Sequence, residues 1–239
     1  MTKLATLLIM VGTLALSSCA ESQSPAYSRS DIKDIIREYL LENPEIVREA
    51  LTELKRREDM AAINAHRDEL FNDRRDMVVG PDTAKVTIVE FFDYNCGFCK
   101  QSTDWVASVI EKHPEDVRVI FKELPILDGR TNTSRNAARA ALAAGRQGRY
   151  FDMHLALMAE RSLTSERIDQ VAEKVGIDVA KMRRDMDDPA LDAQIEDALL
   201  LMNRLPPLTG TPFFLINDQY LSGASIPLLQ AMLDEELAN

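Results

Sequence analysis

Two cysteines placed three positions apart are the residues of this chain with the clearest capacity for chemistry. Cys96 and Cys99 follow the apolar run "TIVEFFDYN", at a point where a strand is expected to end and a helix to begin. A thiol at a helix N-terminus lies near unpaired backbone N–H groups, which stabilise its thiolate. A thiolate is the species that attacks a disulfide. The spacing predicts a redox pair in which Cys96 attacks and Cys99 resolves the mixed disulfide.

Two other uses of this pair fit the sequence less well. A zinc site needs four ligands, but the only histidines, His66, His113 and His154, fall on separate expected helices. A structural disulfide more often joins distant segments, because closing a two-residue loop removes little chain entropy. We therefore expect neither a metal nor a cofactor. His154 and Trp105 are interpreted as core or surface residues without a chemical role.

The first residues indicate export from the cytoplasm. Residues 4–16 are apolar and uncharged, a run shorter than the roughly 20 residues of a membrane-spanning helix but suited to a signal peptide. The sequence "LSSC" at residues 16–19 resembles the lipobox of bacterial lipoproteins, which favours cleavage before Cys19 and lipid attachment to it. Ordinary cleavage after Ala20 is the alternative. We predict a signal peptide over 1–18, a tether over 19–29, and an envelope, periplasmic location.

Composition narrows the classes of partner. The chain has 239 residues, 46% of them hydrophobic, and a formal net charge of -11. An acidic protein of this kind is a poor candidate for nucleic acid or for anionic lipid surfaces. We therefore expect no nucleic-acid partner, and contact with a membrane only through an N-terminal lipid.

Residues 30–75 are expected to form a helical arm ahead of any strand. Ser30 is the expected N-cap, and Asn43 with Pro44 ends the first helix and starts the second. The apolar face either packs on its own domain or pairs with copies of the chain. The adopted prediction is a homo-oligomer, a dimer or a trimer. Two apolar stripes define that face: Ile32, Ile35, Ile36, Tyr39 and Leu40, then Ile46, Val47, Ala50, Leu51 and Leu54.

The rest of the chain reads as an α/β domain over residues 80–239. After the turn-rich hinge "VVGPDTAK", a strand is expected at 85–92, a helix at 97–111 and a second strand in "VRVIFKELP". Several helices fill residues 133–203, and two strands in "TPFFLIND" and "QYLSG" precede a last helix. The order β-α-β, helices, β-β-α indicates an α/β layer with a helical insertion at about 130–205.

These landmarks, taken together, resemble the DsbA family of thioredoxin-fold disulfide oxidoreductases of the bacterial envelope. "VEFFDYNCGFC" resembles the active-site strand and turn of that family, and "GTPFFLIN" resembles its cis-proline loop. "IREYLLENPEIVREAL" resembles the N-terminal segment of the ScsC-type subgroup and of related outer-membrane-associated proteins. The resemblance spans about residues 30–235 and implies a thioredoxin fold.

The resemblance also implies roles for individual residues. Pro212 is the expected cis-proline, and Thr211 before it is expected to pair with substrate through its backbone. Glu90 matches a buried acid that helps to move the proton of the inner thiol. Gly97 and Phe98 stand where the strongly oxidising members carry Pro-His, which implies a less oxidising pair, more like the disulfide isomerases.

The expected function is that of an envelope thiol-disulfide oxidoreductase, an isomerase or reductase that works as an oligomer. Its partners would be unfolded or misoxidised envelope proteins and a membrane redox partner. Two alternatives remain: a monomeric DsbA-like dithiol oxidase, and a lipid-anchored binding or chaperone protein on the same fold.

Overall fold

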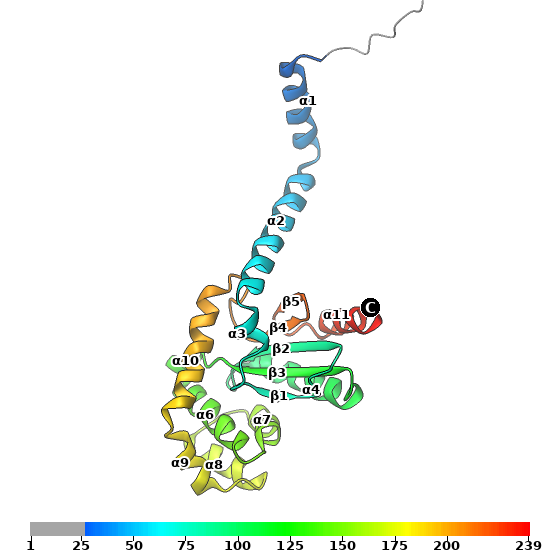
Figure 1. Cartoon of the computed structure of the whole chain (residues 1–239). Helices are drawn as coiled ribbons and strands as arrows, with labels where there is room; N and C mark the ends of the chain where they lie inside the picture. The colour runs from blue at the N-terminus through cyan, green and yellow to red at the C-terminus, as the bar shows by residue number, and fades with distance from the viewer. Residues whose placement is uncertain (1–26) are drawn as a thin grey trace, which may run out of the picture. The chain divides into compact units, whose positions relative to one another are not determined.

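The computed structural model describes residues 27–239, in two compact units that are treated separately (Figure 1). The expected signal peptide, Cys19 and most of the tether lie outside the described residues. The first unit is described from residue 27 to Thr52. The second unit runs from Glu53 to Asn239. Within residues 27–239, no helix combines the length and the apolar character needed to cross a bilayer.

The first unit consists of α1 (Arg29–Glu42) and the first half of α2 (Pro44–Ala65). Ser28, rather than Ser30, is the N-cap of α1, and it forms a capping box with Asp31. Pro44 begins α2 as expected from the sequence. The Asn43 side chain, however, donates to the carbonyl of Tyr39 at 2.9 Å, so it caps the end of α1.

The second half of α2 and the short helix α3 (Arg67–Phe71) belong to the second unit. Ile63 and Leu70 are fully buried in a core cluster that includes Phe213. Asp59 accepts a hydrogen bond of 2.7 Å from the Tyr220 hydroxyl. The compact unit therefore begins at Glu53, inside the segment that the sequence assigned to the arm. The reason is that the partners of Ile63 and Leu70 lie far along the chain.

A five-stranded mixed sheet in the order β1-β3-β2-β4-β5 forms the centre of the second unit. The strands β2 and β3 are parallel, and the other pairs are antiparallel. The edge strand β1 overlaps the start of the segment expected to be a hinge, where pairing with β3 makes it a strand. The bounds are β1 Met77–Val79, β2 Val86–Phe92, β3 Val117–Glu123, β4 Phe213–Ile216 and β5 Gln219–Ser222.

Helices follow in the expected order. The helix α4 (Gly97–Lys112) joins β2 to β3, and α11 (Ile226–Ala238) ends the chain. The helical insertion lies between β3 and β4, close to the predicted 130–205. It comprises α5 Asp128–Thr131, α6 Ser134–Gly145, α7 Tyr150–Met158, α8 Ser165–Lys174, α9 Val179–Met186 and α10 Pro189–Arg204.

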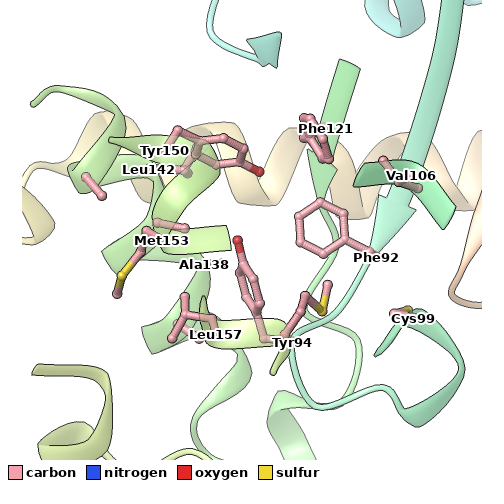
Figure 2. Close-up of a cluster of buried hydrophobic side chains, with 14 of the residues drawn as sticks. Phe92, Tyr94, Cys99, Val106, Phe121, Ala138, Leu142, Tyr150, Met153 and Leu157 are labelled. Atoms are coloured by element: carbon pink, nitrogen blue, oxygen red, sulfur yellow. The ribbon is translucent and has the colours of Figure 1, made fainter. Parts of the chain in front are cut away.

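The alternation of side chains along the strands gives the sheet two buried faces. Ile88 and Phe92 of β2 belong to a core with α4 and the insertion helices, shown in part in Figure 2. Val89 and Phe91 belong to a second core that includes Ile63 and residues of α10. Because β2 is covered on both faces, the loop that follows it leaves the sheet from a rigid base.

Candidate active site

The two cysteines open α4, as the sequence predicted. Cys96 is the N-cap of this helix, and its sulfur accepts a hydrogen bond of 3.4 Å from the Cys99 backbone N–H. The Cys96 sulfur also lies 3.3 Å from the carbonyl oxygen of Thr211. Both cysteines are free thiols, and both are buried. The helix start thus holds one sulfur in contact with backbone donors, which is the arrangement that favours a thiolate.

The surroundings separate the two thiols chemically. The pKa of Cys96 is lowered to about 6, chiefly by a hydrogen bond from the Cys99 thiol, with further contributions from Thr211 and from backbone N–H groups. Burial opposes this shift. The pKa of Cys99 is raised well above its usual range, first by burial and then by its hydrogen bond to Cys96. At neutral pH, Cys96 is therefore mostly a thiolate and Cys99 remains a thiol.

A cis peptide bond joins Thr211 to Pro212, which confirms the prediction from the sequence. The bond immediately precedes β4, the strand that pairs with β2. This pairing brings the Thr211 carbonyl beside Cys96, across 115 positions of sequence. The cysteine motif and the proline loop, which are far apart in the sequence, therefore lie next to each other in the fold.

Glu90 lies in β2, where it pairs with Phe121 of β3 and Phe214 of β4. Its side chain is fully buried, and neither carboxylate oxygen has a hydrogen-bond partner. Burial raises the pKa of Glu90 to about 8; the nearby Ser102 hydroxyl opposes this rise, and the charge of Cys96 adds to it. Glu90 in turn contributes to the raised pKa of Cys99. Glu90 is thus a buried acid near the pair, and a surface position at a strand edge is excluded.

The two residues between the cysteines differ in exposure and in the space around them. The Phe98 side chain is 63% exposed. A Cβ added at Gly97 would meet no atom within 4 Å, so this position does not require glycine for lack of space. Neither residue carries a charge that could stabilise the Cys96 thiolate.

His154 lies in a buried polar cluster that the sequence analysis did not identify. The hydroxyls of Tyr94 and Tyr150 donate to Glu123 at 3.1 and 2.9 Å, and Tyr94 lies 3.3 Å from Nδ1 of His154. Figure 2 shows the Tyr94 ring reaching from the turn after β2 toward the insertion helices. Burial lowers the pKa of His154 to about 3, so its ring is neutral. These residues are spread over about 60 positions of the chain, so no local sequence pattern indicates that they form a cluster.

Trp105 is also largely buried, and its indole N–H donates to Gln230 at 2.9 Å. This contact packs α4 against α11 and agrees with a structural role. Among residues 27–239, no group of three or more His, Cys, Asp or Glu side chains is placed to hold a metal ion.

Comparison with protein families gives two matches. The DSBA-like thioredoxin domain matches residues 87–233, which is more than half of the chain. The Copper resistance protein ScsC N-terminal domain matches residues 29–61. The second match covers α1 and most of α2.

Individual proteins agree with these matches. The thiol-disulfide exchange protein alpha-DsbA2 from Wolbachia pipientis superposes with a TM-score of 0.69 at 29% identity, covering 76% of this chain and 97% of its own. A linker-deletion mutant of ScsC from Proteus mirabilis gives a TM-score of 0.68 at 29% identity, over 89% of this chain and 98% of its own.

Curated relatives are longer proteins. The Na(+)/H(+) antiporter NhaA 3 of Salinispora tropica is 33% identical over 147 residues, which are 60% of this chain and 22% of the antiporter. The chain spans about a quarter or less of the length of such relatives. Because the family model covers more than half of the chain, with β3, β4, β5, both cysteines and the cis-proline, the chain belongs to the DsbA-like thioredoxin-domain family and carries an N-terminal segment of the ScsC type.

Proposed function

We propose that this protein is a thiol-disulfide oxidoreductase of the bacterial envelope that acts mainly as a disulfide isomerase or reductase. One observation carries the proposal: the Cys96 sulfur, with its pKa lowered to about 6, lies at the start of α4 beside the Thr211 carbonyl. A thiol that is ionised at neutral pH attacks disulfides and also leaves a mixed disulfide readily.

The chemistry starts with attack of the Cys96 thiolate on a substrate disulfide. The S–S bond of the substrate breaks, a Cys96–substrate disulfide forms, and one substrate thiolate leaves. In isomerisation, another substrate thiolate attacks this mixed disulfide and releases Cys96, so no net electron transfer occurs. In reduction, Cys99 attacks the Cys96 sulfur, the pair becomes a disulfide, and the substrate leaves as a dithiol that has gained two electrons.

Glu90 is the group proposed to receive the proton of Cys99 during resolution. The Cys99 thiol must lose its proton before it attacks, although burial strongly favours its neutral form. Glu90 is buried, has unpaired carboxylate oxygens and a pKa of about 8, and raises the pKa of Cys99. A carboxyl with this pKa is mostly protonated at neutral pH but exchanges its proton readily there, and its ionised form is the one that accepts the proton of Cys99.

Thr211 and Pro212 form the proposed substrate-binding edge. The Thr211 carbonyl already contacts the attacking sulfur, so an extended substrate segment beside it would bring its own disulfide near Cys96. The uncharged pair Gly97 and Phe98 supports isomerisation over strong oxidation. Compared with a pair that has a cationic residue between its cysteines, the reduced state of this pair has one stabilising interaction fewer.

Homo-oligomerisation through the arm is part of the proposal. None of the described residues of α1 is buried, and apolar side chains on α1 and the first half of α2 are strongly exposed. Burying each such side chain fully contributes roughly 1.5–3 kcal/mol, so a dimer or trimer would gain several times that amount. The exposed set is Ile32, Ile35, Ile36, Tyr39, Leu41, Val47, Leu51 and Leu54.

The proposed partners are unfolded or misoxidised envelope proteins, with a membrane redox partner that restores the dithiol. The pattern of residues 1–18 supports export, and "LSSC" supports a lipid on Cys19. Mass spectrometry of the mature N-terminus tests this anchor. A lipid-modified Cys19 supports it, whereas an unmodified chain that starts at Glu21 contradicts it.

Two activity assays and one mass measurement test the proposal. The wild type should reduce insulin and refold scrambled ribonuclease, and light scattering should give an oligomeric mass. Substituting Ile35→Asp and Ile36→Asp together should give a monomer that reduces insulin but loses most isomerase activity. Arg37→Asp is the control, because it changes the net charge by the same amount outside the apolar stripe.

The alternative is a monomeric dithiol oxidase. Wild-type protein that is already monomeric, or a monomeric double variant that still isomerises fully, would favour this alternative. Protein with neither redox activity would instead favour a binding or chaperone role.

A further inference from the structure

A closed cycle of hydrogen bonds holds the turn that precedes Cys96. The Asp93 carboxylate accepts from the Asn95 backbone N–H at 2.7 Å and from the Ser134 hydroxyl at 2.8 Å. The Asn95 side-chain amide donates to the same Ser134 hydroxyl oxygen at 2.9 Å. Asp93 and Ser134 are essentially inaccessible to solvent. The cycle therefore links two residues of the turn to the first residue of α6 without relying on water.

The link extends over the whole junction between α5 and α6. The Asn95 amide also lies within hydrogen-bonding distance of the hydroxyls of Thr131 and Thr133, at 3.2 and 3.1 Å. The second oxygen of Asp93 accepts from the Leu127 backbone N–H at 2.8 Å. We call Thr131, Thr133 and Ser134 the hydroxyl cradle. Three hydroxyl groups from the helical insertion thus surround one amide in the turn.

The turn determines where the Cys96 backbone lies. The Cys96 N–H donates to the Asp93 carbonyl at 3.0 Å, and Cys96 then caps α4 with an extended backbone conformation. This geometry allows its sulfur to accept the Cys99 N–H and to face the Thr211 carbonyl. A sulfur displaced by a fraction of an ångström would lose part of its hydrogen bond from the Cys99 N–H, since hydrogen bonds weaken steeply with poor geometry.

We propose that Asn95 and the hydroxyl cradle are positioning residues, through which the helical insertion sets the thiolate character of Cys96. The fixed turn keeps the Cys96 sulfur at the helix N-terminus, and a loosened turn would let it move away from its donors. A less stabilised thiolate also makes the dithiol state less favourable, so the pair becomes a weaker oxidant. The inference rests on the exchange chemistry proposed above and adds a set of residues outside the cysteine motif.

Paired substitutions separate positioning from simple loss of packing. Thr131→Val with Thr133→Val removes two hydroxyls and keeps the side-chain shape, whereas Thr131→Ser with Thr133→Ser keeps both hydroxyls. Asn95→Ala removes the amide. Asn136→Ala is the matched control, because that amide donates to Ser165 elsewhere in the insertion.

The readouts are the Cys96 pKa, from the pH dependence of iodoacetamide alkylation, and the equilibrium constant with glutathione. Asn95→Ala and the double valine variant should raise the Cys96 pKa. They should also shift the glutathione equilibrium at least threefold toward the oxidised pair, about 14 mV for a two-electron couple. The double serine variant and Asn136→Ala should remain near wild type. Urea unfolding, measured alongside, reports any loss of stability.

The inference would be overturned if the valine and alanine variants lose stability but keep the wild-type Cys96 pKa and the wild-type equilibrium constant with glutathione. The hydroxyl cradle would then be a purely structural link. Serine variants that shift as much as the valine variants would also overturn it. If Asn95→Ala does not fold, the valine and serine pair still decides the question. The pKa needs no protein substrate, so its shift can be seen even if insulin reduction and isomerisation both fail, which would refute the proposed function alone.

Discussion

The sulfur of Cys96 lies 3.3 Å from the carbonyl oxygen of Thr211, a residue 115 positions later in the chain. The sheet makes this contact possible, because β4 pairs with β2, Cys96 follows the end of β2, and Thr211 precedes the start of β4. The attacking thiol and the proposed substrate-binding edge are therefore positioned by one pair of neighbouring strands. Substitutions of the Thr211 side chain should therefore change the pKa of Cys96.

Thr211→Val should raise the pKa of Cys96, since the Thr211 side chain contributes to its lowering. A hydrogen bond contributes about 1 kcal/mol, and one pKa unit corresponds to about 1.4 kcal/mol, so a rise of roughly 0.5 to 1 unit is expected. The pH dependence of thiolate absorbance measures it. Thr209→Val, at an exposed position nearby, is the control. An unchanged Cys96 pKa in Thr211→Val would show that the hydroxyl has no influence.

Phe98→His should make the pair more oxidising. The Phe98 side chain is exposed, so a histidine there can be accommodated, and its cationic form would stabilise the neighbouring thiolate. We expect the glutathione equilibrium to shift at least tenfold toward the dithiol, about 30 mV for two electrons. Phe98→Gln supplies a neutral polar side chain as control. A shift of equal size in Phe98→Gln would mean that polarity, rather than charge, is responsible.

Glu90 should make the stability of the protein depend on pH. Its pKa is about 8 in the folded state and about 4.3 in an unfolded chain. Between these values the folded state binds one proton more than the unfolded state. The free energy of unfolding should therefore fall as pH rises, by up to about 1.4 kcal/mol per pH unit.

Urea unfolding between pH 5 and pH 8 measures this effect, in a background with Cys96→Ser and Cys99→Ser to remove thiol titration. Adding Glu90→Gln to that background should make the profile less steep over the same range, leaving the slope that other buried acids such as Asp76 contribute. Parallel profiles with and without Glu90→Gln would contradict the raised pKa of Glu90.

Local patterns predicted much of the fold and of the candidate site. The strand before Cys96 and the helix after it are found where the sequence indicated, and each depends on a short run of residues whose preferences agree. The cis bond at Pro212 is found where the resemblance to the DsbA family implied it. The strand β1 and the start of the second unit were not predicted, because they depend on pairing with β3 and on burial of Ile63 and Leu70 against distant strands.

The hydrogen-bond cycle at Asp93 and the cluster at His154 were missed for the same reason. Ser134 lies 41 positions from Asp93, and His154 lies 60 positions from Tyr94. Asp93 and Asn95 are polar residues between a buried strand and a reactive cysteine. That position is the one feature of the sequence that indicates a role for Asp93 and Asn95 beyond forming a turn.

The central claim is that Cys96 attacks substrate disulfides and Cys99 resolves the product. Trapping in cells tests it most directly, by gel analysis of mixed disulfides after acid quenching and thiol blocking. Cys99→Ser should accumulate mixed disulfides with envelope proteins, because the resolving thiol is absent. Cys96→Ser should accumulate none, since the remaining Cys99 thiol is fully buried, whereas Cys96 is 7% exposed, and the pKa of Cys99 is raised. The reverse pattern, with complexes on Cys99 but not on Cys96, would contradict the account.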